Sequence, residues 1–194
     1  MANSNTQGFG LIPVGTLGST PSTQGQGAYK IDAGYSAAVI YHGAPVVSAS
    51  GYVVEGTVVT TGTTGNCGVL NGIFYNAATT LKPTWNNGYI TAVTPANSED
   101  TTAFVLDNPF QLFEIATDDA ITQAGHMQTF NMNAVSGSTT TGQSSNTIDI
   151  ASTNATNYSW RLVRLADDPS NSDITAAYTS VIVQSNLNEF LRKL

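Results

Sequence analysis

Few side chains in this sequence could do chemistry, and the acidic ones come in adjacent pairs. Asp118 precedes Asp119 and Asp167 precedes Asp168, so each pair could offer carboxylate oxygens to a calcium ion. Adjacent side chains of a strand point to opposite faces, however, and acidic pairs are typical of solvated strand ends and turns. We therefore expect no metal site at either pair.

The two histidines and the remaining acids do not form a recognisable catalytic arrangement. His42 stands beside a Gly-Ala-Pro turn and His126 follows a glycine, and neither belongs to an HxH, HExxH or GxSxG motif. Glu114 and Asp118 are four residues apart, so on one strand they would share a face, as the carboxylates of a hydrolase must. Because Glu114 lies in an apolar segment, we expect no catalytic residues, and a wall-degrading hydrolase is kept only as an alternative.

No residues for a cofactor stand out. Cys67 is the single cysteine, so it cannot form an internal disulfide, and no Cys or His lies at metal-ligand spacing from it. We expect it to be a small buried apolar residue. The glycine-rich residues 62–68 lack the Lys and Ser/Thr that complete a phosphate-binding loop. The sequence therefore predicts no cofactor.

Charge and hydropathy narrow the range of partners. The net charge is −7 and only 10% of the residues are charged. Phosphate backbones are bound by clustered Lys and Arg, so we expect no nucleic-acid partner. No apolar run approaches the roughly 20 residues that cross a bilayer, and no signal peptide pattern opens the chain. We expect a soluble protein without a membrane partner.

The densest apolar segment is residues 102–119, around which we expect the core to form. Two β-rich runs, 103–106 and 110–117, flank Asp107, Asn108 and Pro109. Proline donates no backbone hydrogen bond and makes the preceding residue extended, so the chain should turn or bulge there. Both faces of the second run are apolar, which predicts a central strand.

The rest of the chain is rich in Thr, Ser, Asn and Gly, which favours strands and tight turns over helices. We predict an all-β fold, an antiparallel sandwich or a barrel-like domain. Further strands are expected within residues 35–41, 46–55, 67–75, 158–166 and 177–184. Asn71 and Gly72 should make a hairpin turn or a bulge, and Trp85 should cover the edge of the core. A helical pattern over residues 186–194 predicts a short C-terminal helical turn.

The first 28 residues differ in character from the body that follows. They hold short apolar islands among Gly, Ser, Thr, Asn and Gln, and cannot close a core of their own. We predict an extended N-terminal arm over 1–28 and a β-rich body over 29–194. The arm should be mobile in an isolated monomer unless it packs against its own body or against a neighbouring subunit, and both partners remain open.

Several short motifs follow one another along the chain. They are GFGLIPV at 8–14, AYKIDAGYSAAVIYHGAPVVSASG at 28–51, NCGVLNGIFY at 66–75, FVLDNPFQLFEIATD at 104–118, and the ending between 162 and 190. Their order resembles that in the virion structural proteins of tailed double-stranded DNA bacteriophages. Two positions depart from that family: Ala44 stands where an acidic residue is common, and Asn188 where a histidine is common. No role of a single residue is therefore carried over.

The resemblance implies a capsid decoration, or cement, protein on the exterior of the virion's capsid. Its partners would be the major capsid protein and further copies of itself, taken as a trimer. An extended arm of low charge can lie along a neighbour and extend its sheet, with apolar side chains as anchors. The arm residues assigned to this protein contact are Phe9, Leu11, Ile12, Pro13 and Val14. On this hypothesis, deletion of residues 1–27 leaves a folded body that no longer binds the capsid.

A host-attachment or tail-fibre associated module is the alternative. It would also be β-rich and rich in Thr and Asn, and it would bind a receptor or glycan. That function predicts that aromatic side chains such as Trp85 and Tyr89 are exposed together.

Overall fold

The computed structural model describes residues 3–18, 25–35, 39–56, 65–90, 93–133, 137–154 and 158–191. These residues form twelve strands and two short 3-10 turns, which confirms the predicted all-β fold. The strands are β1 Ile12–Thr16, β2 Gly27–Ile31, β3 Pro45–Ala49, β4 Tyr52–Glu55, β5 Gly68–Asn76, β6 Pro83–Asn86, β7 Thr101–Leu106, β8 Gln111–Ala116, β9 Thr129–Asn133, β10 Thr147–Asn154, β11 Trp160–Leu165 and β12 Ser180–Ser185. The 3-10 turns are η1 Ala96–Ser98 and η2 Gln123–Gly125.

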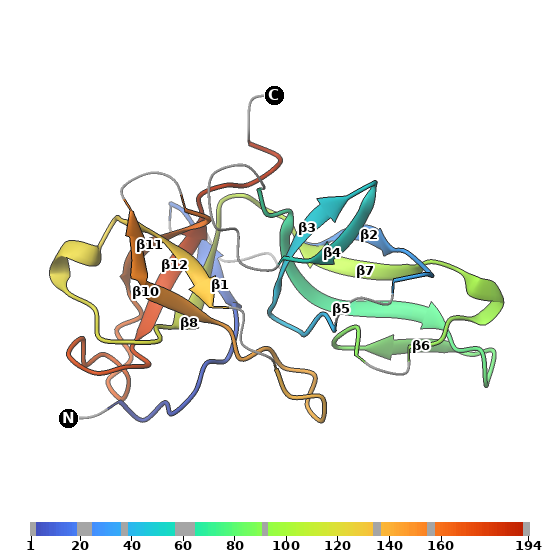
Figure 1. The fold of residues 1–194 in the computed structure, drawn as a ribbon, viewed down its shortest axis with the longest axis horizontal. Coiled ribbons are helices and arrows are strands. Elements are labelled where there is room, and N and C mark those ends of the chain that lie inside the picture. The colour runs from blue at the N-terminus through green and yellow to red at the C-terminus, as the bar shows by residue number, and fades with distance from the viewer. Residues whose placement is uncertain are drawn as a thin grey trace.

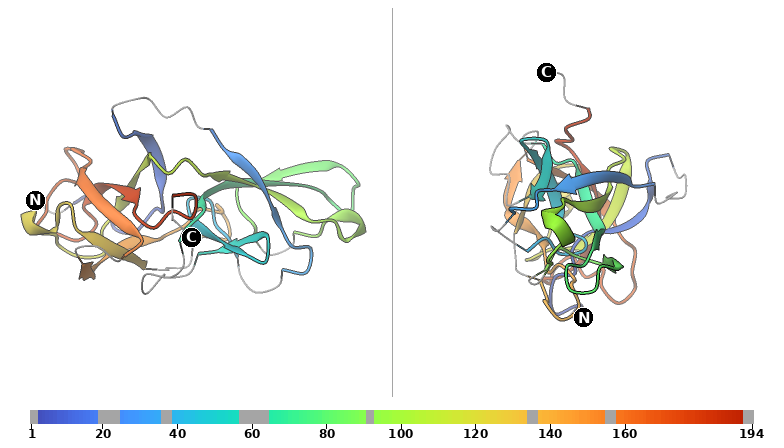
Figure 2. Two further views of the ribbon diagram at one scale, coloured as in Figure 1. Left: turned by 90° about the horizontal axis from the view of Figure 1, so that it is seen from above. Right: turned by 90° about the vertical axis from the view of Figure 1, so that its right-hand side faces the viewer.

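The strands form two antiparallel sheets, here called sheet A and sheet B. Sheet A has the order β1-β8-β12-β11-β9-β10, and sheet B has the order β2-β7-β5-β3-β4, with β6 paired to β5. The sheets lie side by side along the long axis of the molecule, sheet A on the left and sheet B on the right of Figure 1. The view from above in Figure 2 shows the same elongated arrangement of two lobes.

Sheet A curls into a barrel-like lobe around an aromatic core. Thr117, directly after β8, forms a parallel bridge with Ile148 of β10, so the last strand of the sheet returns to its second. Inside, the rings of Phe113 and Trp160 meet edge to face with centroids 5.9 Å apart. Edge-to-face pairs contribute about 0.5–1.5 kcal/mol beyond the area that they bury. This closed lobe holds the largest fully buried side chains of the described residues.

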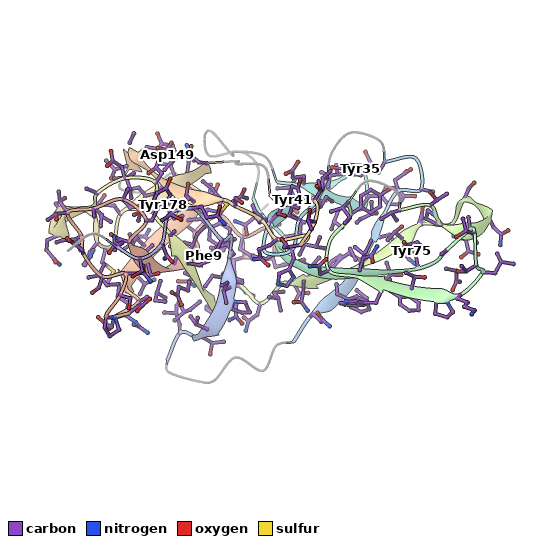
Figure 3. All side chains as sticks on the ribbon, turned by 90° about the horizontal axis from the view of Figure 1, so that it is seen from below. Phe9, Tyr35, Tyr41, Tyr75, Asp149 and Tyr178 are labelled. Carbon is purple, nitrogen blue, oxygen red and sulfur yellow. The ribbon has the colours of Figure 1, made fainter. Side chains whose placement is uncertain are left out.

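Sheet B surrounds a second core, built from smaller side chains. Ile73, Ala103 and Val105 point inward from β5 and β7, and tyrosines pack around them. Figure 3 labels three of these tyrosines, Tyr35, Tyr41 and Tyr75. The two lobes are joined by packing, because Val69 of β5 and Leu106 of β7 belong to the core of sheet A.

The turn predicted between the two central runs is present and connects the two lobes. β7 ends at Leu106 in sheet B and β8 begins at Gln111 in sheet A. Between them, Asn108 accepts hydrogen bonds from the backbone N–H groups of Phe110 and Gln111, each at 3.0 Å. β8 pairs with β1 on one side and β12 on the other, so the prediction of a central strand is confirmed.

Two local predictions are confirmed. The register of β5 against β7 shifts between Leu70 and Gly72, so the Asn71-Gly72 signal marks a bulge rather than a hairpin turn. Cys67 is buried, and its thiol donates a hydrogen bond of 3.1 Å to Glu189 Oε2. Burial, reinforced by the neighbouring carboxylate, raises the pKa of the Cys67 thiol to about 12.

Two other local predictions differ from the structure. Of the strand expected over 35–41, residues 36–38 lie outside the described residues, and the described part shows an isolated bridge between Ile40 and Tyr89. The helical turn expected over 186–194 is replaced, up to residue 191, by a bridge and a non-helical turn. Asn188 pairs with Asn66, and the N–H of Glu189 donates to the carbonyl of Asn66, so these backbone groups are used by a strand-like contact. Residues 192–194 lie outside the described residues.

Candidate protein-contact site

The start of the chain is bound to its own body. The side-chain amide of Asn3 donates to the carbonyl of Ala177 at 2.9 Å and to Thr179 Oγ1 at 3.1 Å. Its Oδ1 accepts the backbone N–H of Asp173 at 3.0 Å, and the N–H of Asn5 donates to Asn171 Oδ1 at 2.7 Å. These contacts hold the segment before β1 against the loop between β11 and β12.

The next residues enter the junction between the lobes. Gln143 Nε2 donates to the carbonyl of Phe9 at 2.7 Å, and the N–H of Leu11 donates to the carbonyl of Gly43 at 2.9 Å. The side chain of Leu11 is fully buried in the core of sheet A. Gly10 has a φ of 73°, a left-handed conformation that favours glycine, and a Cβ there would lie 2.8 Å from that of Ser144. Figure 3 labels Phe9, which lies on the sheet A side of the molecule.

β1 then forms an edge of sheet A. It runs antiparallel to β8, with Ile12 opposite Glu114 and Pro13 opposite Phe113. The register shifts between Pro13 and Gly15, which makes Val14 the extra residue of a bulge. A proline and a bulge both limit the pairing of a sheet edge with another strand. β1 therefore offers a partner its side chains more readily than a continuous row of backbone hydrogen-bonding groups.

Four apolar side chains are exposed along this edge, and we call them the β1 patch. They are Ile12, Val14, Leu17 and Phe110, each between 41% and 51% exposed. Leu17 and Phe110 are neighbours, because the N–H of Leu17 donates to the carbonyl of Phe110 at 3.0 Å. Single exposed apolar residues are ordinary, but a cluster on one sheet edge is typical of a contact surface.

A groove of about 520 Å³ adjoins the β1 patch. Val14 and Leu17 line one side of it, and Glu114 and Arg164 contribute opposite charges. Arg164 lies 3.6 Å from Asp167, and both side chains are largely exposed, so this ion pair contributes little to stability. The groove therefore combines an apolar margin with charged groups of both signs.

The structure divides the five predicted contact residues. Ile12 and Val14 are exposed, Phe9 and Pro13 are half-buried, and Leu11 is part of the core. The hypothesis of a detachable arm therefore needs revision, because deletion of residues 1–27 would remove β1 and the buried Leu11 together. The contact surface is reduced to the side chains that the body leaves exposed.

Sequence reasoning missed Leu17 and Phe110 as members of the patch. The sequence predicts Phe110 in the strand that follows it, because Phe110 continues the alternation of Leu112 and Glu114. The turn around Asn108 instead moves Phe110 out of the ladder and beside Leu17. The proline at 109 was the signal that could have placed Phe110 in the turn.

The acidic residues singled out from the sequence have local structural partners. Asp118 accepts hydrogen bonds from Asn133 Nδ2 at 2.6 Å and from the N–H of Ile150 at 2.9 Å, whereas Glu114 faces the groove. Asp168 accepts from Asn171 Nδ2, which lowers the pKa of its carboxyl. Among the described residues, no group of three or more His, Cys, Asp or Glu side chains could hold a metal ion.

Trp85 and Tyr89, named together for the attachment alternative, belong to different clusters. Tyr89 packs edge to face on Tyr35, with centroids 5.6 Å apart, at the margin of the sheet B core. Trp85 is 49% exposed and packs on Phe104, with centroids 5.2 Å apart. Trp85 is thus exposed beside Phe104 of sheet B and not beside Tyr89.

Comparisons of the chain with protein-family models, with curated proteins and with solved structures found no match. Over the described part of the chain, no helix has the length and apolar character needed to cross a bilayer.

Proposed function

We propose that this chain is a capsid decoration protein that binds the outer surface of a bacteriophage head and reinforces its major capsid protein. The proposal depends mainly on the β1 patch, an exposed apolar cluster on a sheet edge that is held firmly to the body. The ordered motifs that resemble tailed-phage virion proteins supply the class of partner.

A rigid patch suits repeated contacts on a lattice. Because Leu11 and Asn3 already fix the segment before β1, little conformational entropy is lost when a partner covers Ile12 and Val14. If the decoration protein forms oligomers, each contact after the first forms at high effective concentration, so weak individual contacts add to stable occupancy. The few charged residues of the chain favour apolar and backbone contacts over ion pairs.

The test is occupancy on capsid shells that lack the native protein. Val14→Asp and Leu17→Asp place a carboxylate in the patch, and we expect each to lower occupancy by about tenfold or more, because an unpaired charge would be buried on binding. Leu81→Asp is the matched control, since Leu81 is 72% exposed on the sheet B side of the molecule. Thermal unfolding of each variant confirms that the fold is kept.

The proposal fails if the patch variants occupy shells as well as the unchanged protein does. It also fails if Leu81→Asp lowers occupancy as strongly as Val14→Asp, because the loss would then follow from charge alone.

A further inference from the structure

The outer face of sheet B carries a row of side chains that the proposed capsid contact does not use. Trp85 stands opposite Phe74, Phe74 opposite Thr102, and Thr102 opposite Lys30, across β6, β5, β7 and β2. Phe104 lies beside this row, opposite Gly72. Trp85 and Phe74 are 49% and 39% exposed, so the described residues leave this face open.

Trp85 lies close against β5 because Gly72 has no side chain. A Cβ at Gly72 would lie 2.3 Å from Cζ2 of Trp85, which shows how closely the indole approaches the backbone of β5. Phe104 supports the indole from the side at a centroid distance of 5.2 Å and an angle of 36°. The indole is therefore supported by β5 and β7 while about half of the side chain stays exposed, which is the preorganisation that binding platforms need.

The far end of the row carries the one charge on it. Lys30 Nζ donates to Thr102 Oγ1 at 3.0 Å, and within the described residues no carboxylate lies in ion-pair reach of it. Three strand spacings separate Lys30 from Trp85, a span of roughly 14 Å. The amides of Asn71 and Gln26, which bond to each other at 2.7 Å, are exposed and can exchange that bond for one to a ligand.

We propose that this face, the sheet B platform of Trp85, Phe74, Phe104 and Lys30, binds an acidic oligosaccharide. Sugar rings have apolar C–H faces that stack on aromatic rings, and their hydroxyl groups suit the amide and hydroxyl side chains nearby. A carboxylate two or three sugars along the chain reaches Lys30, the one cation of the row, whose Nζ donates to Thr102 Oγ1. A single-stranded nucleic acid also stacks on aromatic rings, but it needs a groove of several cations, and this row has one.

The experiment titrates the full chain with tetragalacturonate, a hyaluronan tetrasaccharide and sialyllactose, with cellotetraose as the neutral comparison. Binding is measured by isothermal titration calorimetry, a readout that Trp85→Ala leaves intact. In the unchanged protein, tryptophan fluorescence reports contact at Trp85, because Trp85 is half-exposed whereas Trp160 is buried. At least one acidic probe is expected to bind. Trp85→Ala should weaken that binding by about tenfold or more, and Lys30→Gln by about threefold. Met127→Ala is the control, because it changes an exposed residue that is distant from the row in the sequence. It should leave the binding of the acidic probe unchanged.

The inference is overturned if none of the acidic probes binds at millimolar concentration, or if Trp85→Ala binds as the unchanged protein does. It is also overturned if cellotetraose binds as tightly as the acidic probes and Lys30→Gln has no effect. Lys30 is exposed on an edge strand, so Lys30→Gln stays informative even if Trp85→Ala disturbs the fold. A loss of shell occupancy in Trp85→Ala without saccharide binding would identify a protein contact instead, which also contradicts the inference.

Discussion

The two lobes place their apolar side chains differently. Sheet A closes around Trp160, Phe113 and Phe130, all fully buried, and leaves aliphatic side chains exposed at its β1 edge. Sheet B has a core without a buried tryptophan or phenylalanine among the described residues; tyrosines pack at that core, whereas Trp85 and Phe74 are exposed on the outer face. The comparison teaches that the exposed apolar side chains of one chain can gather on an edge strand in one sheet and on the outer face in the other.

The largest expected effect compares the two tryptophans. Trp160→Ala should lower the free energy of unfolding by about 3–5 kcal/mol, because it empties the centre of the sheet A core. Trp85→Ala should cost less than about 1 kcal/mol, because half of that side chain is already in water. Urea denaturation measures both, and equal costs would contradict the division between a closed core and an open platform.

The next comparison uses adjacent residues at the start of β1. Leu11→Ala should cost about 2–4 kcal/mol, since it leaves a cavity in the sheet A core. Ile12→Ala should cost less than about 1 kcal/mol, because Ile12 belongs to the exposed patch. If both variants unfold at the same urea concentration, the N-terminal segment is not anchored as described.

The features of the fold differ in how far the sequence predicts them. The turn before β8 follows from local chemistry, because Pro109 and Asn108 favour a turn whatever surrounds them. The burial of Leu11 and the exposure of Ile12 depend on the register with β8, which pairs Ile12 with Glu114 far along the chain. The sequence also does not predict the division into two lobes, because β7 and β8 are neighbours in sequence but belong to different sheets.

The sheet B platform could not be predicted for the same reason. Trp85 was expected to cover the edge of the core, and its orientation depends on Gly72, which approaches it only when β6 pairs with β5. Sequence patterns report which residues alternate along a strand, whereas cross-strand neighbours require the topology.

A smaller effect concerns the segment before β1. Asn3→Ala removes an amide that bonds to the carbonyl of Ala177 and to Thr179 Oγ1, and should cost about 1–2 kcal/mol. Gln7→Ala is the control, because Gln7 is exposed. Equal effects of the two changes on thermal unfolding would show that the Asn3 contacts do not hold this segment in solution.

The smallest expected effect is a pH dependence in sheet B. Burial raises the pKa of Glu55, so its charged form is disfavoured in the folded state. The penalty is absent below the pKa of the unfolded chain and complete above the raised pKa of the folded one. Because solvent screens this half-exposed group, Glu55→Gln should stabilise the fold by only about 0.5 kcal/mol at pH 7 and by nothing near pH 3. Urea midpoints at the two pH values check this, and a gain at pH 3 would contradict it.

Hydrogen exchange of the protein bound to capsid shells tests most directly whether the β1 edge is the capsid contact. Peptides that cover residues 12–17 report on the β1 patch, and peptides that cover residues 83–86 report on β6 of the sheet B platform. We expect shells to slow exchange at 12–17 and to leave 83–86 unchanged. Slower exchange at 83–86 with no change at 12–17 would contradict the proposal.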